Sequence, residues 1–270
     1  MSSSDIDAAT KLYGVVGQNI SYTLSPAIHN YIFRRVGYNA VYLAFDIPET
    51  KFDKVFPTLL EICEGLNITI PYKEKAVKYL SDVDVAAGAI GAVNTVYRGK
   101  GYNTDYLAVK ALARNAVGAL SGGVCYVYGA GGAARAAAFA LGELGCRIVV
   151  VNRTRDRAEK LVQDLSRFGV AASTDTVCRG HSDVVVNATP APSVVPDECL
   201  DTELVVEFVY RPVETDLVKR ARSRGVKVVD GLTILVRQAI EAQRIWLGID
   251  ISGEEVLGYL YARKLIWYDV

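Results

Sequence analysis

The sequence of 270 residues lacks several features that mark other classes of protein. Its formal net charge is zero, so the composition gives no support to binding of nucleic acid or of an anionic membrane. No apolar run is long enough to cross a bilayer, and the first residues lack the charged and apolar regions of a signal peptide. We therefore expect a cytoplasmic protein with neither a nucleic-acid partner nor a membrane partner.

Cysteine, histidine and methionine are also scarce. The five cysteines show no C-x-x-C spacing, and neither of the two histidines lies at metal-ligand spacing from them. We predict no metal site, and we interpret the cysteines as buried thiols: Cys63, Cys125, Cys146, Cys178 and Cys199. A single methionine beside sixteen tyrosines is a skewed usage that points to a hot habitat.

The most informative stretch joins two apolar runs through a glycine-rich turn. The run Val124–Tyr128 has the length of a buried strand, and it leads into the glycines of Gly129–Gly132. The Ala-rich segment Ala133–Leu144 favours a helix, and a second apolar run follows at Ile148–Val151. A tight turn alone would need glycine, but strand, turn, helix and strand in this order predict a dinucleotide-binding unit that holds a pyrophosphate at the helix N-terminus.

The residues after the second strand favour one cofactor. A unit that binds NAD usually has Asp or Glu there to accept from the ribose 2′-hydroxyl. This chain has Asn152 and Arg153 instead, with Thr154 as a candidate cap of the next helix, and then Arg155 and Arg157. A solvated basic face is the alternative, but cations that oppose a helix dipole favour an arriving anion, and we predict the 2′-phosphate of NADP.

Strands alternate with helices along the rest of the chain, which predicts an α/β protein of two domains with mainly parallel sheets. We assign residues 1–106 to an N-terminal α/β substrate-binding and catalytic domain and 107–231 to a Rossmann-type NADP-binding domain. The Gly/Ser-rich stretch 117–123 is the expected linker. Residues 232–270 carry no strand pattern, and we expect two helices that pack back on the first domain.

Four segments rich in small polar residues follow expected strands or turns of the first domain. They are SYTLSP at Ser21–Pro26, NITIPYK at Asn67–Lys73, GAVNT at Gly91–Thr95 and YNTD at Tyr102–Asp105. Open parallel sheets bind ligands at the carboxyl ends of their strands. Each segment also has a structural interpretation: Ser25 as an N-cap, asparagines as turn residues, and Asp105 at a helix start.

Taken together, these motifs resemble the shikimate dehydrogenase family. The same family order continues with Gly129–Ala134, Asn152–Thr154, Asn187–Thr189, Asp230–Leu232 and Gln238. The resemblance covers nearly the whole chain, from about Tyr13 to Gly248. It implies NADP-dependent interconversion of 3-dehydroshikimate and shikimate, a step of chorismate and aromatic amino-acid synthesis.

The resemblance also implies roles for individual residues. Lys73 is the expected proton-transfer group, in the first turn of a helix that we predict from Pro71 to about Leu80, and Asp105 is its catalytic partner. The expected substrate-binding residues are Thr23, Ser25, Thr69, Lys73, Asn94, Asp105, Tyr210 and Gln238. The expected cofactor-binding residues are Gly129, Ala130, Gly131, Gly132, Ala133, Asn152, Arg153, Thr154, Arg157, Thr189 and Gly231.

Two positions depart from the family pattern. Thr23 stands where serine is usual, which leaves a quinate dehydrogenase or a dual-substrate enzyme as an alternative. Glu207 stands where Asp is more usual, and the sequence gives no reason for it. A catalytically silent sensor of NADP and a polyol acid would be expected to lose Lys73 or Asp105, and both are present. We expect a monomer or a homodimer whose partner is a small-molecule substrate.

Overall fold

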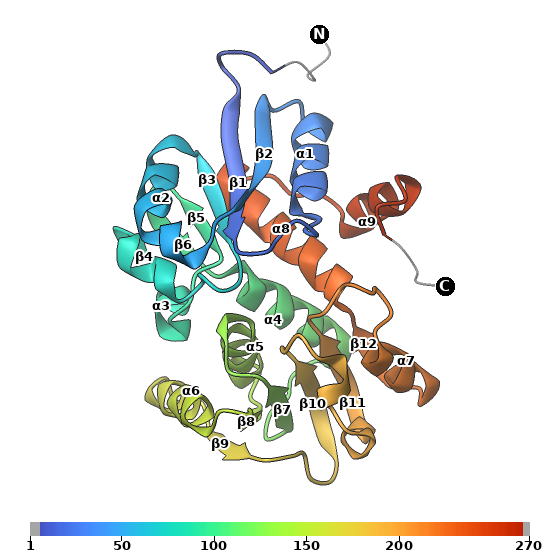
Figure 1. Cartoon of the computed structure of the whole chain (residues 1–270). Coiled ribbons are helices and arrows are strands. Elements are labelled where there is room, and N and C mark those ends of the chain that lie inside the picture. Colours follow the sequence, from blue (N-terminus) through green and yellow to red (C-terminus); the bar gives the residue numbers. More distant parts are fainter. Residues whose placement is uncertain (1–5, 267–270) are drawn as a thin grey trace. The chain divides into compact units, whose positions relative to one another are not determined.

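The computed structural model describes residues 6–266, apart from the side chain of Pro192, and they form two compact units (Figure 1). The first unit contains the described residues up to Thr104 together with Val236–Ile266, and the second contains Asp105–Leu235. The chain therefore passes between the units inside two helices, α4 (Thr104–Val117) and α8 (Gly231–Leu247). The expected linker at 117–123 is wrong, because backbone hydrogen bonds of Leu120 and Gly122 hold it within the second unit.

The first unit is built on a six-stranded mixed sheet in the order β2-β1-β3-β5-β6-β4. Pairing is parallel between β1 and β2, β1 and β3, and β4 and β6, whereas β5 pairs antiparallel with β3 and β6. The strands β5 and β6 form an antiparallel hairpin with a turn at residues 98–99. The strands are β1 (Lys11–Gly17), β2 (Ala40–Asp46), β3 (Gly65–Ile68), β4 (Asp82–Val83), β5 (Thr95–Tyr97) and β6 (Lys100–Tyr102).

The helices of this unit are α1 (Ser25–Arg35), α2 (Glu49–Ile62), the short 3₁₀ helix η1 (Lys75–Tyr79), α3 (Val85–Ile90) and α9 (Gly253–Ala262). The helix expected from Pro71 is wrong, because only η1 forms there and it begins after Lys73. Lys73 lies in a turn, and its backbone carbonyl accepts from the N–H of Val93 at 2.9 Å. The dipole of a first helical turn therefore does not act on its ammonium group.

The C-terminal helices pack on the first unit, as predicted. Trp246 of α8 lies in a buried cluster with Tyr13, Phe33 and Tyr42, and its indole N–H donates to the carbonyl of Val96 at 3.1 Å. The helix α9 contacts α1 through the stacked rings of Tyr31 and Tyr259, whose centroids are 4.0 Å apart. Burial of these aromatic rings accounts for the return of the chain.

His29 of α1 is fully buried in the same region. Its ring stacks on Tyr42 at 4.3 Å, and its Nδ1 lies 2.8 Å from the Gln243 side-chain amide of α8. Burial disfavours the charged imidazolium and lowers the pKa of His29 to about 3. His29 is therefore neutral in the folded protein near neutral pH.

The second unit is a parallel sheet of six strands in the order β12-β11-β10-β7-β8-β9. Numbered along the chain within this unit, the order is 3-2-1-4-5-6 read from β9, the arrangement of a doubly wound dinucleotide-binding fold. Its strands are rich in buried valine, as expected for a sheet covered on both faces. They are β7 (Val124–Tyr128), β8 (Arg147–Val151), β9 (Ala172–Asp175), β10 (Ser182–Asn187), β11 (Thr202–Glu207) and β12 (Lys227–Val229).

The helices α5 (Gly132–Glu143) and α6 (Arg155–Arg167) lie where the sequence predicts them. The short strand β9 and the helix α7 (Asp216–Ser223) carry weak patterns and were not predicted. Two 3₁₀ turns, η2 (Pro192–Val194) and η3 (Asp197–Leu200), complete the unit. The two-domain α/β fold with a Rossmann-type second domain is thus confirmed.

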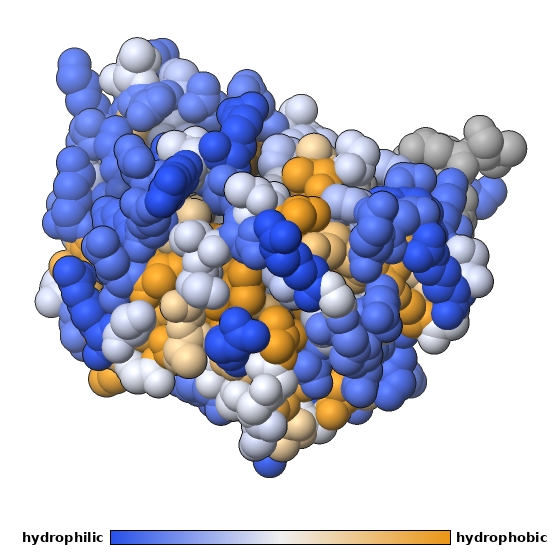
Figure 2. Space-filling view, turned by 90° about the horizontal axis from the view of Figure 1, so that it is seen from below, coloured by the Kyte–Doolittle hydropathy of each residue, from blue (hydrophilic) through white to orange (hydrophobic). Residues whose placement is uncertain are grey.

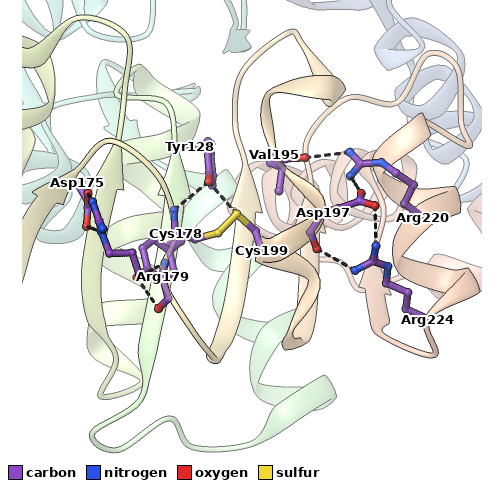
Figure 3. Close-up of a disulfide and its surroundings, with 10 residues drawn as sticks. Tyr128, Asp175, Cys178, Arg179, Val195, Asp197, Cys199, Arg220 and Arg224 are labelled. Carbon is purple, nitrogen blue, oxygen red and sulfur yellow. Dashed lines mark hydrogen bonds and ion pairs between the residues drawn. A yellow bond between two sulfur atoms is a disulfide. The ribbon is translucent and has the colours of Figure 1, made fainter.

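Two disulfides contradict the interpretation of the cysteines as buried thiols. Cys125 near the start of β7 is joined to Cys146 just before β8, with their Cα atoms 6.0 Å apart. Cys178 is joined to Cys199 of η3, and the hydroxyl of Tyr128 lies 3.0 Å from the Cys199 sulfur (Figure 3). The spacing was uninformative because each bridge joins residues 21 positions apart that the parallel sheet and its flanking turns bring together.

The surface carries hydrophobic residues in scattered places. Figure 2 shows a face on which hydrophilic residues surround several hydrophobic areas. Exposed large hydrophobic side chains of the second unit include Leu107, Phe168 and Val194. Isolated residues of this kind are common on protein surfaces and do not mark a docking site. Within residues 6–266, no helix has the length and apolar character that a membrane span requires.

The disulfides predict the thiol content of the purified protein. When the protein is denatured without reductant, a thiol reagent should modify one cysteine in each chain, Cys63. After reduction of the disulfides it should modify all five cysteines. Each bridge closes a loop of 21 residues, so its loss should lower the free energy of unfolding by about 3 kcal/mol. The Cys63→Ser variant serves as the control and should give no reaction before reduction. Three or five reactive thiols in the unreduced wild type would contradict the pairing.

The two histidines predict distinct titrations. A hydrogen bond from the His181 ring to the Asp201 carboxylate raises the pKa of His181 above 6.5, whereas burial lowers that of His29 to about 3. In NMR spectra, the His181 ring signals should titrate with a midpoint above pH 6.5, while the His29 ring signals should stay constant down to about pH 4. Since the unfolded His29 binds a proton below pH 6.5, its contribution to stability is complete above that pH. About 2 kcal/mol should be lost by pH 5. Titration of both rings near pH 6.5 would refute the buried neutral state.

Candidate functional site

The glycine turn of the second unit lies at the point where the strand order reverses, between β7 and β10. The backbone N–H of Gly129 donates to the carbonyl of Val151 at the end of β8, at 2.9 Å. On the other side, the N–H of Ala188 after β10 donates to the carbonyl of Tyr128, also at 2.9 Å. Three segments that follow strands are therefore joined at one edge of the sheet, which is where doubly wound folds bind ligands.

The turn has the shape that close approach of a phosphate requires. Gly129 has φ +115°, a conformation that favours glycine, and a Cβ there would lie 3.1 Å from the Ala188 carbonyl oxygen. Gly131 is the N-cap of α5, and a Cβ on it would meet no atom within 4 Å. No side chain caps this helix, so the first N–H groups after Gly131 are available to an anion. The segment Gly129–Ala133 fits a pyrophosphate.

The predicted basic cluster follows β8. Thr154 occupies the N-cap position of α6, as expected, but its side chain makes no capping bond. Its carbonyl instead accepts from the Asn152 amide at 2.8 Å. Arg155 pairs with Glu159 at 2.7 Å. Arg153 and Arg157 are exposed and have no ion-pair partner within residues 6–266, so their guanidinium groups remain available to a phosphate.

Thr189 and Gly231 also lie in the second unit. Thr189 follows β10, and its N–H and hydroxyl both donate to the Asn187 side-chain oxygen, at 3.1 and 2.8 Å. Gly231 begins α8, and a Cβ there would lie 2.4 Å from the Val209 carbonyl oxygen. The missing side chain of Gly231 thus permits close packing of α8 on the segment that carries Tyr210.

In the first unit, a chain of hydrogen bonds crosses the interior. The buried Tyr42 hydroxyl donates to Asn67 at 2.7 Å, and the Asn67 amide donates to Thr95 at 3.0 Å. The Thr23 hydroxyl donates to that of Ser25 at 3.2 Å, and Ser25 lies close to the Tyr42 hydroxyl. The chain connects NITIPYK with GAVNT, and the Thr23–Ser25 pair of SYTLSP lies beside its first member.

The same chain continues to the fourth segment and to α8. The Thr95 and Thr104 hydroxyls are 3.1 Å apart, and the Thr104 hydroxyl lies 3.4 Å from the Gln238 side-chain oxygen. Asn94 is 2% exposed, and its side-chain oxygen accepts from the Thr104 backbone N–H at 2.7 Å. The structure therefore brings the predicted residues Asn94 and Gln238 to one place.

Three predicted substrate residues lie next to the ends of α1 and β3: Thr23, Ser25 and Thr69. The expected N-cap at Ser25 is wrong by one residue, because Leu24 is the N-cap of α1 and Ser25 is its first helical residue. Thr69 follows β3, and a Cβ on Gly17 would lie 2.5 Å from its methyl group. Close packing of Gly17 thus fixes Thr69 beside the end of β1.

The two predicted catalytic residues, Lys73 and Asp105, are the last residues of the NITIPYK and YNTD segments. Lys73 is half-buried in the turn after Thr69, and Asp105 is buried in the first turn of α4, one residue after Thr104. The Thr104 backbone is held by Asn94, so the start of α4 is fixed by the polar interior of the first unit. Asp105 and Tyr210 belong to the second unit, and the other predicted substrate residues belong to the first.

Four buried residues in this chain of hydrogen bonds were not predicted as site residues: Tyr42, Asn67, Thr95 and Thr104. Three of them lie inside the quoted motifs, so their position in those motifs was the available signal. Tyr42 carries no such signal, because a tyrosine in a strand is ordinarily a core residue. Among residues 6–266, no group of acidic, histidine and cysteine side chains has the arrangement of a metal site.

Two protein-family models match this chain in sequence. Residues 15–96 match the shikimate dehydrogenase substrate binding domain, and residues 111–206 match the shikimate / quinate 5-dehydrogenase model. The first match runs from within β1 to within β5, and the second includes the glycine turn and the basic cluster.

Individual relatives are similar along nearly their whole length. A shikimate dehydrogenase (NADP(+)) of Saccharolobus islandicus is 57% identical over 266 residues, which is 97% of this chain and 99% of the relative. Shikimate 5-dehydrogenase from Thermus thermophilus, solved with NADP(H) and shikimate, superposes with a TM-score of 0.79 at 33% identity, covering 95% of this chain and 100% of that one. A quinate dehydrogenase from Corynebacterium glutamicum, solved with NAD, has a TM-score of 0.79 at 27% identity, covering 94% and 99%.

Proposed function

This chain belongs to the shikimate dehydrogenase family, and we propose that it catalyses the reversible, NADP-dependent reduction of 3-dehydroshikimate to shikimate. The observation that carries this function is the hydrogen-bonded chain from Tyr42 to Gln238, with the bonded pair Thr23 and Ser25 beside it, which holds hydroxyl and amide groups at fixed positions inside the unit matched to substrate binding. Preorganised groups of this kind suit a small substrate with several hydroxyls and a carboxylate.

The substrate residues divide by chemistry. The hydroxyl groups of Thr23, Ser25 and Thr69 can donate to the substrate carboxylate, with Tyr210 as a further donor. Asn94 and Gln238 carry amides that can both donate and accept, which suits ring hydroxyls. We infer that the 6–104 part of the first unit, with Gln238 from α8, is the substrate domain, and that 105–235 is the NADP domain.

Lys73 and Asp105 are the groups that we assign to proton transfer. The chemistry that NADP supplies when bound is hydride transfer to and from its nicotinamide ring. Oxidation of a secondary alcohol also requires loss of the hydroxyl proton, which needs a positioned base. Lys73 can exchange that proton through its amine, and the Asp105 carboxylate can accept a hydrogen bond from the reacting hydroxyl.

The second unit has the residues that NADP requires. The segment Gly129–Ala133 offers space and backbone N–H groups for the pyrophosphate, and Arg153 and Arg157 offer planar donors for the 2′-phosphate. Asn152 provides no carboxylate to repel that phosphate. NAD would gain nothing from the two arginines, so NADP is the preferred cofactor.

We further infer that the protein works in the cytoplasm as a monomer or a homodimer. Disulfides are rare in the cytosol of most organisms but common in intracellular proteins of hyperthermophiles. The two bridges and the low methionine content fit a heat-adapted source.

A quinate or dual-substrate dehydrogenase is the second candidate, supported by the similarity to the quinate dehydrogenase of known structure. Quinate carries a hydroxyl on the carbon that bears its carboxylate, and shikimate does not. The extra methyl group of Thr23 narrows that end of the site, which favours shikimate.

The function is tested by measuring oxidation of shikimate and of quinate, each with NADP and with NAD. Shikimate with NADP should be the best combination, and Lys73→Ala should lower its kcat by roughly two to four orders of magnitude. The KM for shikimate should change far less, because the carboxylate and hydroxyl contacts remain. Retention of more than about a tenth of kcat would remove Lys73 from proton transfer. Faster turnover of quinate would favour the second candidate.

Cofactor choice is tested at Arg153, with Arg155 as a matched control two residues away. Hydrogen bonds to a charged phosphate contribute about 1.5–3 kcal/mol, so wild type should prefer NADP over NAD at least about tenfold in kcat/KM. Arg153→Ala should raise the KM for NADP far more than that for NAD. Arg155→Ala should leave both nearly unchanged, since Arg155 is paired with Glu159. Equal losses with both cofactors in Arg153→Ala would make Arg153 a structural residue.

A further inference from the structure

The carboxylate of Glu207, at the end of β11, is fully buried. It accepts four hydrogen bonds and has no ion-pair partner within residues 6–266. The Asn187 amide lies 2.9 and 3.1 Å from its two oxygens, the Val209 N–H 2.9 Å from Oε1, and the Thr215 hydroxyl 3.2 Å from Oε2. Burial raises the pKa of Glu207, and these donors act in the opposite direction.

The donors come from three different segments. Asn187 ends β10, Val209 lies in the segment after β11, and Thr215 is the N-cap of α7, where its hydroxyl oxygen accepts from the Val218 N–H at 3.2 Å. A single buried carboxylate therefore ties two strand ends and one helix start together. The segment from Phe208 to Glu214, which carries Tyr210, is held at both of its ends.

The contact with Asn187 reaches the glycine turn. Because Glu207 accepts from the amide nitrogen of Asn187, the Asn187 oxygen is directed at Thr189, whose N–H and hydroxyl both donate to it. Ala188, between them, donates to the Tyr128 carbonyl, and its own carbonyl oxygen would lie 3.1 Å from a Cβ on Gly129. A change in the orientation of Asn187 would therefore shift the backbone that packs on the turn.

We propose that Glu207 is a positioning residue for the cofactor: through Asn187 it holds the Asn187–Thr189 segment in the conformation that accepts NADP. This inference rests on the proposed function. It assigns to Glu207 an effect on cofactor affinity without contact between its carboxylate and the cofactor.

The test compares NADP binding by calorimetry in wild type and Glu207→Gln, together with steady-state kinetics and the melting temperature of the free protein. The glutamine keeps the shape of the side chain, but one of the two oxygens that the Asn187 amide contacts becomes an NH₂ donor. We expect the Kd for NADP to rise about tenfold, the size of effect that one misdirected buried hydrogen bond produces. The KM for shikimate should stay within about twofold. Glu203→Gln, at an exposed position on the same strand, is the matched control and should bind NADP like wild type.

A reciprocal exchange separates positioning from general stability. In Asn187→Asp combined with Glu207→Gln, the new carboxylate accepts from the glutamine NH₂ and still accepts from Thr189. The double variant should recover NADP affinity to within about threefold of wild type, whereas Asn187→Asp alone opposes two carboxylates and should bind weakly. Recovery supports the positioning role.

Two results would overturn the inference: unchanged NADP affinity in Glu207→Gln, or a double variant that binds no better than the single changes predict. Either result leaves the proposed function intact as long as wild type binds NADP. Failure of wild type itself to bind NADP would instead refute the proposed function.

Discussion

The second unit depends on one backbone constraint, the absence of a side chain at Gly129. Its positive φ turns the chain sharply out of β7, and the Ala188 carbonyl occupies the space that a Cβ would need. The N–H groups of Gly129 and Ala188 then close this edge of the sheet through the carbonyls of Val151 and Tyr128. Because three strand ends meet there, a larger residue at 129 would disturb the glycine turn, the basic cluster and the Asn187–Thr189 segment together.

The first unit solves a different problem, since its site residues are polar and buried. A buried polar group without a partner costs about 1–3 kcal/mol, so such groups are stable only when each supplies the partner of the next. The chain from Tyr42 through Asn67, Thr95 and Thr104 to Gln238 meets this condition. Each member restricts the rotamer of its neighbours, and the groups left to face a substrate are rigid as a consequence.

Strong local patterns made much of this fold predictable from the sequence. The unit from Val124 to Thr154 combines a valine-rich strand, a glycine turn and an Ala-rich helix, and each element formed within about one residue of its expected bounds. The helix predicted from Pro71 is wrong, because only the short 3₁₀ helix η1 forms there, after a turn. The interpretation of the cysteines as buried thiols was wrong for a different reason. Cys125 and Cys146 lie near the starts of adjacent parallel strands, a proximity that the predicted βαβ unit already contained but that cysteine spacing alone does not reveal.

The role of Glu207 could not be predicted from the sequence. At the level of sequence it was an unexplained departure from an aspartate. In the structure it accepts four hydrogen bonds from three donors, and the length of its side chain matters because both oxygens must reach Asn187 while one also reaches Thr215. Such a role depends on distances between segments 20 and 8 residues away, which no local pattern encodes. Residues that act by orienting others are therefore found by following hydrogen bonds outward from the site, and in this protein that path leads from Thr189 through Asn187 to Glu207.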